Sequence, residues 1–156
     1  TFGSEQHNAP FSVKVEYDRV ITGIREVGQG VNQLLPVLVE CYMRHKFLIS
    51  IQQPEVHLHP KAQAAFGEVI YETSRTPHDN LFLVETHSDY TIDRYRYQIN
   101  KKGEKKKKTQ ILFFVRTRTG NVIKPILIDE NGGYPEKMPK EYGRFFVDEE
   151  LKMLSL

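Results

Sequence analysis

Two short apolar segments, Phe47 to Ile51 and Leu81 to Val84, constrain the fold of this chain more than any other feature. Each segment ends in a polar cluster and is followed by residues with helical periodicity. Short apolar runs are typical of strands covered on both faces, and strands that alternate with helices through short connections form parallel sheets. The sequence therefore predicts an α/β domain with a mostly parallel sheet flanked by helices.

Three helices are expected from the spacing of apolar residues. The first has Asn32 as a candidate N-cap and tolerates Pro36 because that residue is expected near its first turn. The second begins at Pro60, a favourable first helical position, and the third is capped by Ser88 or Asp89. The core-facing stripes consist of Val31, Leu34, Leu35, Leu38, Val39 and Tyr42 in the first helix, and of Ala62, Ala65, Phe66, Val69, Ile70 and Thr73 in the second.

Two hairpins are expected outside these segments. Residues 11–25 alternate apolar and polar side chains with a break at Asp18-Arg19, which indicates two short strands joined by a turn. Thr109 to Arg118 and Val122 to Ile128 are separated by Thr-Gly-Asn, so a C-terminal β-hairpin is expected over residues 109–128.

The composition favours one globular domain without a membrane span. The 156 residues are 39% apolar, and no apolar segment approaches the roughly 18 residues that a bilayer requires. Cys41 is the single cysteine, so no internal disulfide can form, which fits a reducing compartment such as the cytoplasm. Cys41 itself is expected to be a small core residue.

Positive charge is concentrated in one stretch, Lys101 to Lys108. It holds six lysines and one glutamate, so its own charge is +5. The net charge of the whole chain is only +2, so the remaining residues together carry about −3. A solvated loop is the simpler interpretation of such a run. A contact with a nucleic-acid backbone, helped by Arg94 and Arg96, is the alternative.

Three polar segments are candidates for a ligand site. Gln52-Gln53-Pro54-Glu55 and Glu85-Thr86-His87-Ser88 follow the two predicted parallel strands, and ligands of open α/β sheets bind at the carboxyl ends of such strands. The segment from Gly28 to Gln33 lies at a predicted helix start, where backbone N–H groups and the helix dipole favour an anion. Together they predict a phosphate-containing ligand.

These segments also carry a family resemblance. The strings VGQGVNQLLP, FLISIQQPEVHLHPKAQ and LFLVETHSD, in this order, resemble the second half of an ABC-type ATPase head. The likeness is to AAA ATPases related to the overcoming-lysogenization-defect (OLD) proteins and bacterial defence ATPases, and it covers about residues 20–100. It implies the C-terminal portion of a P-loop NTPase fold, with a signature loop at 27–33, a Walker B strand and D-loop at 47–60, and a switch-histidine loop at 81–89.

The resemblance implies ATP and Mg²⁺ as cofactors. Gly28, Gly30 and Asn32 would present amides to the γ-phosphate of a nucleotide held mainly by an opposite subunit, with Gln33 beside them. The family often has serine at the position of Asn32, and asparagine can also donate a hydrogen bond there. A role for Asn32 as a simple N-cap is the open alternative.

The resemblance places Gln52 where an acid normally holds the Mg²⁺ shell, and Gln53 where a glutamate normally polarises water. Amides are weaker partners for Mg²⁺ and cannot act as general bases near neutral pH, so hydrolysis is questionable. Glu55 is the nearest remaining carboxylate, with either a catalytic or a structural role. His87 would be the histidine that contacts the γ-phosphate, with Glu85 as an orienting acid.

His57 and His59 allow two interpretations. Imidazole is a common metal ligand, but zinc sites need three or four protein ligands, and no spaced cysteine or carboxylate set completes one here. In the resemblance this HLHP segment is the D-loop, which implies packing against a partner subunit.

No stretch matches the phosphate-binding pattern G-x-x-x-x-G-K-[ST], so the P-loop is expected on an upstream segment or on another chain. The resemblance then implies an ATP-binding head-to-tail dimer that acts in DNA repair or anti-phage defence and signals to a nuclease or another effector. Two alternatives are a non-hydrolysing, nucleotide-gated regulatory or scaffold subunit and a small nucleic-acid-binding module.

Overall fold

The computed structural model describes residues 13–102, 108–142 and 151. The chain divides into two compact units, residues 1–91 and 92–156, and the boundary falls within helix α3. The first unit contains β1 (Lys14–Tyr17), β2 (Val20–Gly23), the short 3₁₀ helix η1 (Ile24–Glu26), α1 (Gln29–Met43), β3 (Leu48–Gln52), α2 (Pro60–Thr73), β4 (Leu81–Glu85) and the start of α3 (Asp89–Lys102). The second contains the rest of α3, β5 (Thr109–Thr117) and β6 (Gly120–Ile128).

The strands form three separate pairs. β3 and β4 are parallel, in a register that runs from Leu48 opposite Leu81 to Gln52 opposite Glu85. β1 with β2 and β5 with β6 form antiparallel hairpins, which confirms both expected hairpins. The parallel arrangement expected of the sheet is therefore limited, in the part of the chain that the structure describes, to β3 and β4.

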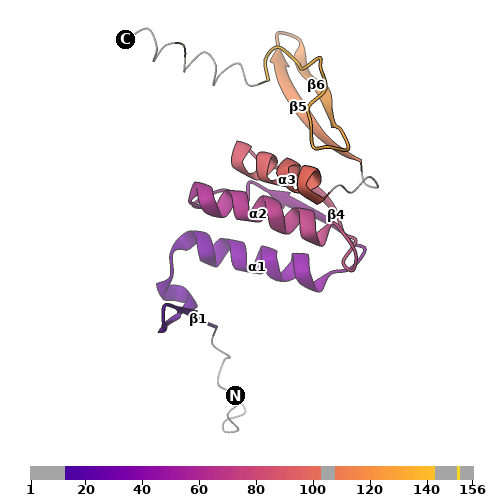
Figure 1. Ribbon diagram of the computed structural model, residues 1–156. Helices are drawn as coiled ribbons and strands as arrows, with labels where there is room; N and C mark the ends of the chain where they lie inside the picture. Colours follow the sequence, from indigo (N-terminus) through magenta and orange to yellow (C-terminus); the bar gives the residue numbers. More distant parts are fainter. Residues whose placement is uncertain (1–12, 103–107, 143–150, 152–156) are drawn as a thin grey trace. The chain divides into compact units, whose positions relative to one another are not determined.

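The β3–β4 pair is covered on one face only, so the expectation of strands buried on both faces is wrong for the described residues. Helices α1 and α2 lie side by side and pack against each other (Figure 1). Ile51 is buried, while Leu48, Leu81 and Leu83 on the alternate positions are 69%, 60% and 58% exposed. Because side chains alternate between the two faces of a strand, one row contributes to the core and the other forms an uncovered apolar row.

Helix α1 differs from its prediction in three respects. Its N-cap is Gly28 instead of Asn32, which lies within the first turn, and Pro36 lies in the middle of the helix. Proline has no N–H, so the carbonyl of Asn32 lacks its usual helical partner. The inward face is also rotated from the predicted stripe: Gly30 and Cys41 are buried, whereas the predicted stripe residues Val31, Val39 and Tyr42 are exposed.

This rotation has a physical cause. Gly30 lies close to the backbone of His57 and Cys41 is fully buried, but both are small, so a pattern based on large apolar residues does not include them. Burial raises the pKa of the Cys41 thiol to about 11, because the thiolate loses its hydration. The expected role of Cys41 as a small core residue is confirmed.

Helix α2 follows its prediction except at Ala65, a residue of the predicted stripe that is exposed. Pro60 is its first residue, and Phe66, Ile70 and Thr73 of the predicted stripe are buried, together with Tyr71. His59 is the N-cap, and its Nδ1 accepts a hydrogen bond from the N–H of Lys61 at 3.2 Å.

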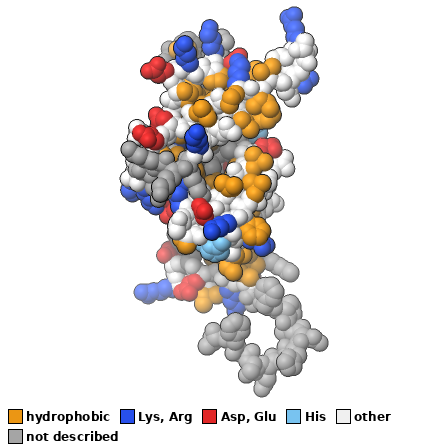
Figure 2. Space-filling model, turned by 90° about the vertical axis from the view of Figure 1, so that its right-hand side faces the viewer, with side chains coloured by type: hydrophobic (Ala, Val, Ile, Leu, Met, Phe, Trp, Pro, Cys, Tyr) orange, Lys and Arg blue, Asp and Glu red, His pale blue; other side chains and the backbone are white. Residues whose placement is uncertain are grey.

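The second unit is held together by polar contacts as well as by its hairpin. The guanidinium of Arg96 lies 3.5 Å from the ring centroid of Tyr134, and its Nε donates to the carbonyl of Gly132 at 2.8 Å. The hairpin has its turn at Arg118-Thr119, and one row of its apolar side chains is exposed, including Phe114 and Leu127. Apolar side chains are also visible among charged ones on the face shown in Figure 2.

Two further expectations concern membrane-spanning helices and the lysine-rich stretch from Lys101 to Lys108. Within the described ranges, no helix has the length and apolar character that a membrane span requires. Lys101 and Lys102 form the last turn of α3 instead of a loop, and residues 103–107 of the lysine-rich stretch lie outside the described residues.

Candidate functional site

The three polar segments predicted from the sequence meet within the first unit. The N–H of Gln53 donates to the carbonyl of Glu85 at 2.8 Å, which extends the pairing of β3 and β4 by one residue beyond the strand. The loop that follows also lies against the start of α1, at Gly30. All three candidate segments therefore lie at the carboxyl ends of the two parallel strands, where α/β proteins bind ligands.

Gly30 brings the start of α1 against the loop after β3. A Cβ atom at this position would lie 2.5 Å from the carbonyl oxygen of His57 and 2.9 Å from a methyl group of Leu58. Gly28, in contrast, has open space around it. The helix start has no side-chain cap, so its first N–H groups remain suited to an anion.

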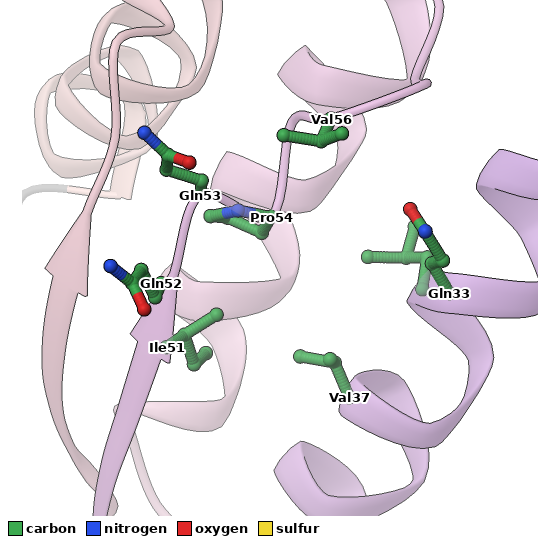
Figure 3. A pocket seen from close by; sticks show the side chains of 8 residues that line it. Gln33, Val37, Ile51, Gln52, Gln53, Pro54 and Val56 are labelled. Atoms are coloured by element: carbon green, nitrogen blue, oxygen red, sulfur yellow. The ribbon is translucent and has the colours of Figure 1, made fainter.

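A pocket of about 330 Å³ lies between α1 and the end of β3. Val37 of α1 faces Ile51 of β3 across it, and Gln33 lies on the α1 side (Figure 3). The amide groups of Gln52 and Gln53 point away from α1 in this view. The pocket is therefore mainly apolar, and it is lined by Gln33, Leu34, Val37, Ile51, Gln52, Gln53, Pro54 and Val56.

Gln52 pairs with an acid on the neighbouring strand. Its Nε2 donates to Oε2 of Glu85 at 3.2 Å, and both side chains lie on the uncovered face of the strand pair. Glu85 was expected to orient His87, but its carboxylate bonds with Gln52 instead, because Glu85 and Gln52 are direct neighbours in the parallel register. A carboxylate is thus present beside Gln52, although Gln52 itself is neutral.

Gln53 has an unusual backbone conformation. Its φ is 44°, in the left-handed region that non-glycine residues rarely adopt. Such conformations persist only where the surroundings hold them, here in part through the bond from the Gln53 N–H to Glu85. The left-handed residue therefore lies directly after β3, at the carboxyl end of the strand.

Glu55 holds the loop that carries His87. Its Oε2 accepts from the hydroxyl of Thr86 at 2.8 Å, and its Oε1 accepts from the N–H of His87 at 2.6 Å. The His87 side chain itself is exposed. Ser88 is the N-cap of α3, as expected, because its Oγ accepts from the N–H of Thr91 at 3.1 Å.

Gln63 belongs to the same polar network, although it is not among the residues predicted from the sequence. Its Oε1 accepts from the Ser88 hydroxyl at 2.6 Å, and its Nε2 donates to the carbonyl of Leu58 at 2.9 Å. Its position in the sequence could have indicated this role. Gln63 lies on the same side of α2 as Phe66 and Ile70, so a polar side chain falls within the core-facing stripe.

The two histidines of the D-loop-like segment have separate environments. His57 is exposed with φ of 64°, and His59 caps α2. Among the described residues, no three His, Cys, Asp or Glu side chains are grouped as a metal site would require.

The donors at the strand ends fit Mg²⁺ in part. Mg²⁺ is usually bound by one or two carboxylates together with phosphate oxygens and water. Glu85 offers a carboxylate and Gln52 offers an amide oxygen at neighbouring positions. The remaining ligands of such a site would have to come from the nucleotide and from residues outside this group.

Comparison with known proteins identifies the family. The sequence matches the AAA ATPase domain family over residues 2–92, which is more than half of the 156 residues and includes all three polar segments. No curated protein and no solved structure matches the chain. This match and the α/β arrangement of the first unit agree, and the chain belongs to the AAA ATPase domain family, whose members are nucleotide-binding proteins of the P-loop type.

Proposed function

We propose that this chain is the C-terminal part of an ABC-like, OLD-related ATPase domain that binds MgATP within a head-to-tail dimer. The observation that carries the proposal is the convergence of three loops at the ends of β3 and β4: the start of α1, the segment after β3 and the segment around His87. Each corresponds to a nucleotide-contacting motif in the resemblance. DNA repair or anti-phage defence, with a nuclease or another effector as partner, is the proposed setting.

The residues have the following proposed roles. The N–H groups at the start of α1, around Gly28 and Gly30, bind the γ-phosphate of a nucleotide held on the opposite subunit, with Asn32 at the end of the same turn and Gln33 after it. Gln52 contacts the Mg²⁺ shell, Gln53 lies near the attacking water, and His87 senses the γ-phosphate. The Mg²⁺ ion, when bound, neutralises phosphate charge.

Hydrolysis is the less well supported half of this function. Gln52 and Gln53 are neutral amides, and both carboxylate oxygens of Glu55 already accept hydrogen bonds. The two amides cannot act as general bases near neutral pH, and the Glu55 carboxylate is bonded to the loop that carries His87. This observation favours the second candidate, a non-hydrolysing, nucleotide-gated regulatory or scaffold subunit.

The first test is MgATP binding by calorimetry. We expect the 156-residue chain alone to bind in the millimolar range or more weakly, on the order of 4 kcal/mol or less, because no segment of it matches a P-loop. A protein that also contains a P-loop segment should bind far more tightly, and His87→Ala should weaken that binding. Tight binding by the chain alone would contradict the proposal.

The second test separates ATPase from regulatory subunit. The regulatory role predicts no turnover by the complete protein, whereas turnover of about 1–10 per second, usual for enzymes, would rule it out. Gln52→Glu alone adds a carboxylate beside that of Glu85, so the two acids repel. The charge-swapped pair, Gln52→Glu with Glu85→Gln, avoids this repulsion and is the better background in which to add Gln53→Glu and look for gained turnover.

The lysine-rich stretch supports a separate nucleic-acid proposal. Its charge of +5 is suited to phosphate contacts, and such binding weakens steeply with added salt. Replacing Lys105 to Lys108 with alanine tests it, since binding that stays unchanged would remove this candidate.

A further inference from the structure

The loop that carries His87 is joined to the loop after β3 by a continuous chain of hydrogen bonds. At one end, Glu55 accepts from the Thr86 hydroxyl and from the His87 N–H. At the other end, Gln63 accepts from the Ser88 hydroxyl and donates to the carbonyl of Leu58. All of these residues belong to the first unit.

Thr86 links the two ends of this series of hydrogen bonds. Its Oγ1 donates to Glu55 at 2.8 Å and accepts from the N–H of Ser88 at 3.0 Å. Ser88 and Thr91 are each only 4% exposed, and the Thr91 hydroxyl donates to the carbonyl of Gln63 at 3.0 Å. The bonds around Ser88 are therefore shielded from competing water, which strengthens them.

Glu55 contributes most to this arrangement. A carboxylate that accepts from a backbone N–H forms a charge-assisted bond, about twice as strong as a neutral one. The Glu55 bonds reach the backbone of His87 and the side chain of Thr86, and they leave the His87 imidazole exposed. Glu55 thus holds the backbone of His87, and neither of its two bonds involves the imidazole ring.

We propose that Glu55 is a positioning residue for His87, and that Glu55 and Gln63 together couple the His87 loop to the loop formed by residues 56–59. A ligand that moves His87 must either move the second loop as well or break these bonds. The same second loop contacts Gly30, so a displacement at His87 also reaches the start of α1. The coupling rests on the proposed function insofar as His87 contacts the nucleotide.

The test combines amide hydrogen exchange with nucleotide affinity in the complete protein. Glu55→Gln keeps the side-chain shape but removes the charge, so exchange at the His87 N–H should become about tenfold faster or more. Affinity for a fluorescent ATP analogue should fall by about the same factor, and Glu55→Asp, which retains the charge, should restore part of both. Glu16→Gln, an exposed acid on β1 of the same unit, is the matched control and should change neither.

A second variant guards against a folding defect. Gln63→Met keeps the length of the side chain and its helical propensity, but it cannot form the bonds to Ser88 and Leu58. It should also accelerate exchange over residues 86–91. Unchanged exchange at His87 in Glu55→Gln overturns the positioning role, whatever the affinity. If exchange rises but even the unmodified protein binds no nucleotide, the proposed function fails, and the positioning role, which exchange measures directly, stands.

Discussion

Gly30 allows two of the proposed nucleotide-contacting loops to lie against each other. The carbonyl oxygen of His57 lies only 2.5 Å from the place where any other residue would have its Cβ. Its backbone is helical, so the reason for glycine here is close approach instead of a special φ angle. Its neighbour Gly28 has no such contact.

This contact predicts the sign of the stability change caused by Gly30→Ala. In a helix interior, Gly→Ala normally stabilises a protein by about 1 kcal/mol. We expect Gly30→Ala to lower the free energy of unfolding instead, by about 1–3 kcal/mol, because the His57 backbone must move. Chemical denaturation measures this, with Gly28→Ser as the control that adds a Cβ in open space. If the Gly30→Ala variant is as stable as the unmodified chain, or more stable, the loop around His57 can move away from α1 at little cost.

At this scale the sequence predicted some residues well and others not at all. Pro60 at a helix start and Ser88 as a cap follow local rules that act over three or four residues, and both are confirmed. The partner of Glu55 lies 32 residues away at His87, and that of Gln52 lies 33 residues away at Glu85. Such pairs arise from the register of β3 and β4, which a single sequence does not specify.

Among the elements, the ends of α1 and α2 and the residue before β3 are joined by one buried residue, Asn80. Asn80 is 0% exposed, its Nδ2 donates to the carbonyls of Cys41 and Arg44, and its Oδ1 accepts from the N–H of Phe47. Its own N–H donates to the carbonyl of Thr73 at the end of α2. Periodicity predicts the helices and strands but not this contact, because a turn asparagine and a core asparagine look alike in sequence.

We therefore expect Asn80→Ala to be severely destabilising. It leaves the N–H of Phe47 and the carbonyls of Cys41 and Arg44, which are partly or fully buried, without these partners. Each such loss costs about 1–3 kcal/mol, so a total of about 3 kcal/mol or more is expected. The comparison is Asn121→Ala, an exposed asparagine with one long contact to Arg116, which should change stability by less than about 0.5 kcal/mol. Thermal and chemical unfolding of both variants provide the measurement, and equal effects would contradict the assigned role.

For the whole molecule, the uncovered face of β3 and β4 is the main feature that the sequence did not predict. Apolar strand sequences were interpreted as buried on both faces, but Leu48, Leu81 and Leu83 are exposed in the described structure. An apolar pattern indicates that a strand face becomes buried, but it does not indicate which segment packs against that face.

An uncovered apolar face predicts association of the isolated chain. We expect Leu48→Lys combined with Leu83→Lys to reduce concentration-dependent light scattering while leaving the melting temperature nearly unchanged, because both side chains are more than half exposed. Ile51→Lys, on the covered face of the same strand, should instead unfold the first unit. Scattering that persists in the double variant would assign the association to another surface, such as the exposed row of the β5–β6 hairpin.

The hydrogen-bond chain through Thr86 also limits how sequences of this kind can diverge. Glu55, Gln63, Thr86 and Ser88 each satisfy a partner that would otherwise be left with a missing bond, so a change at one position favours a compensating change at another. Serine can replace Thr86 because it keeps the hydroxyl, whereas valine of the same shape cannot. Covariation among these four positions in a sufficiently deep set of relatives is the evolutionary trace that this network should leave.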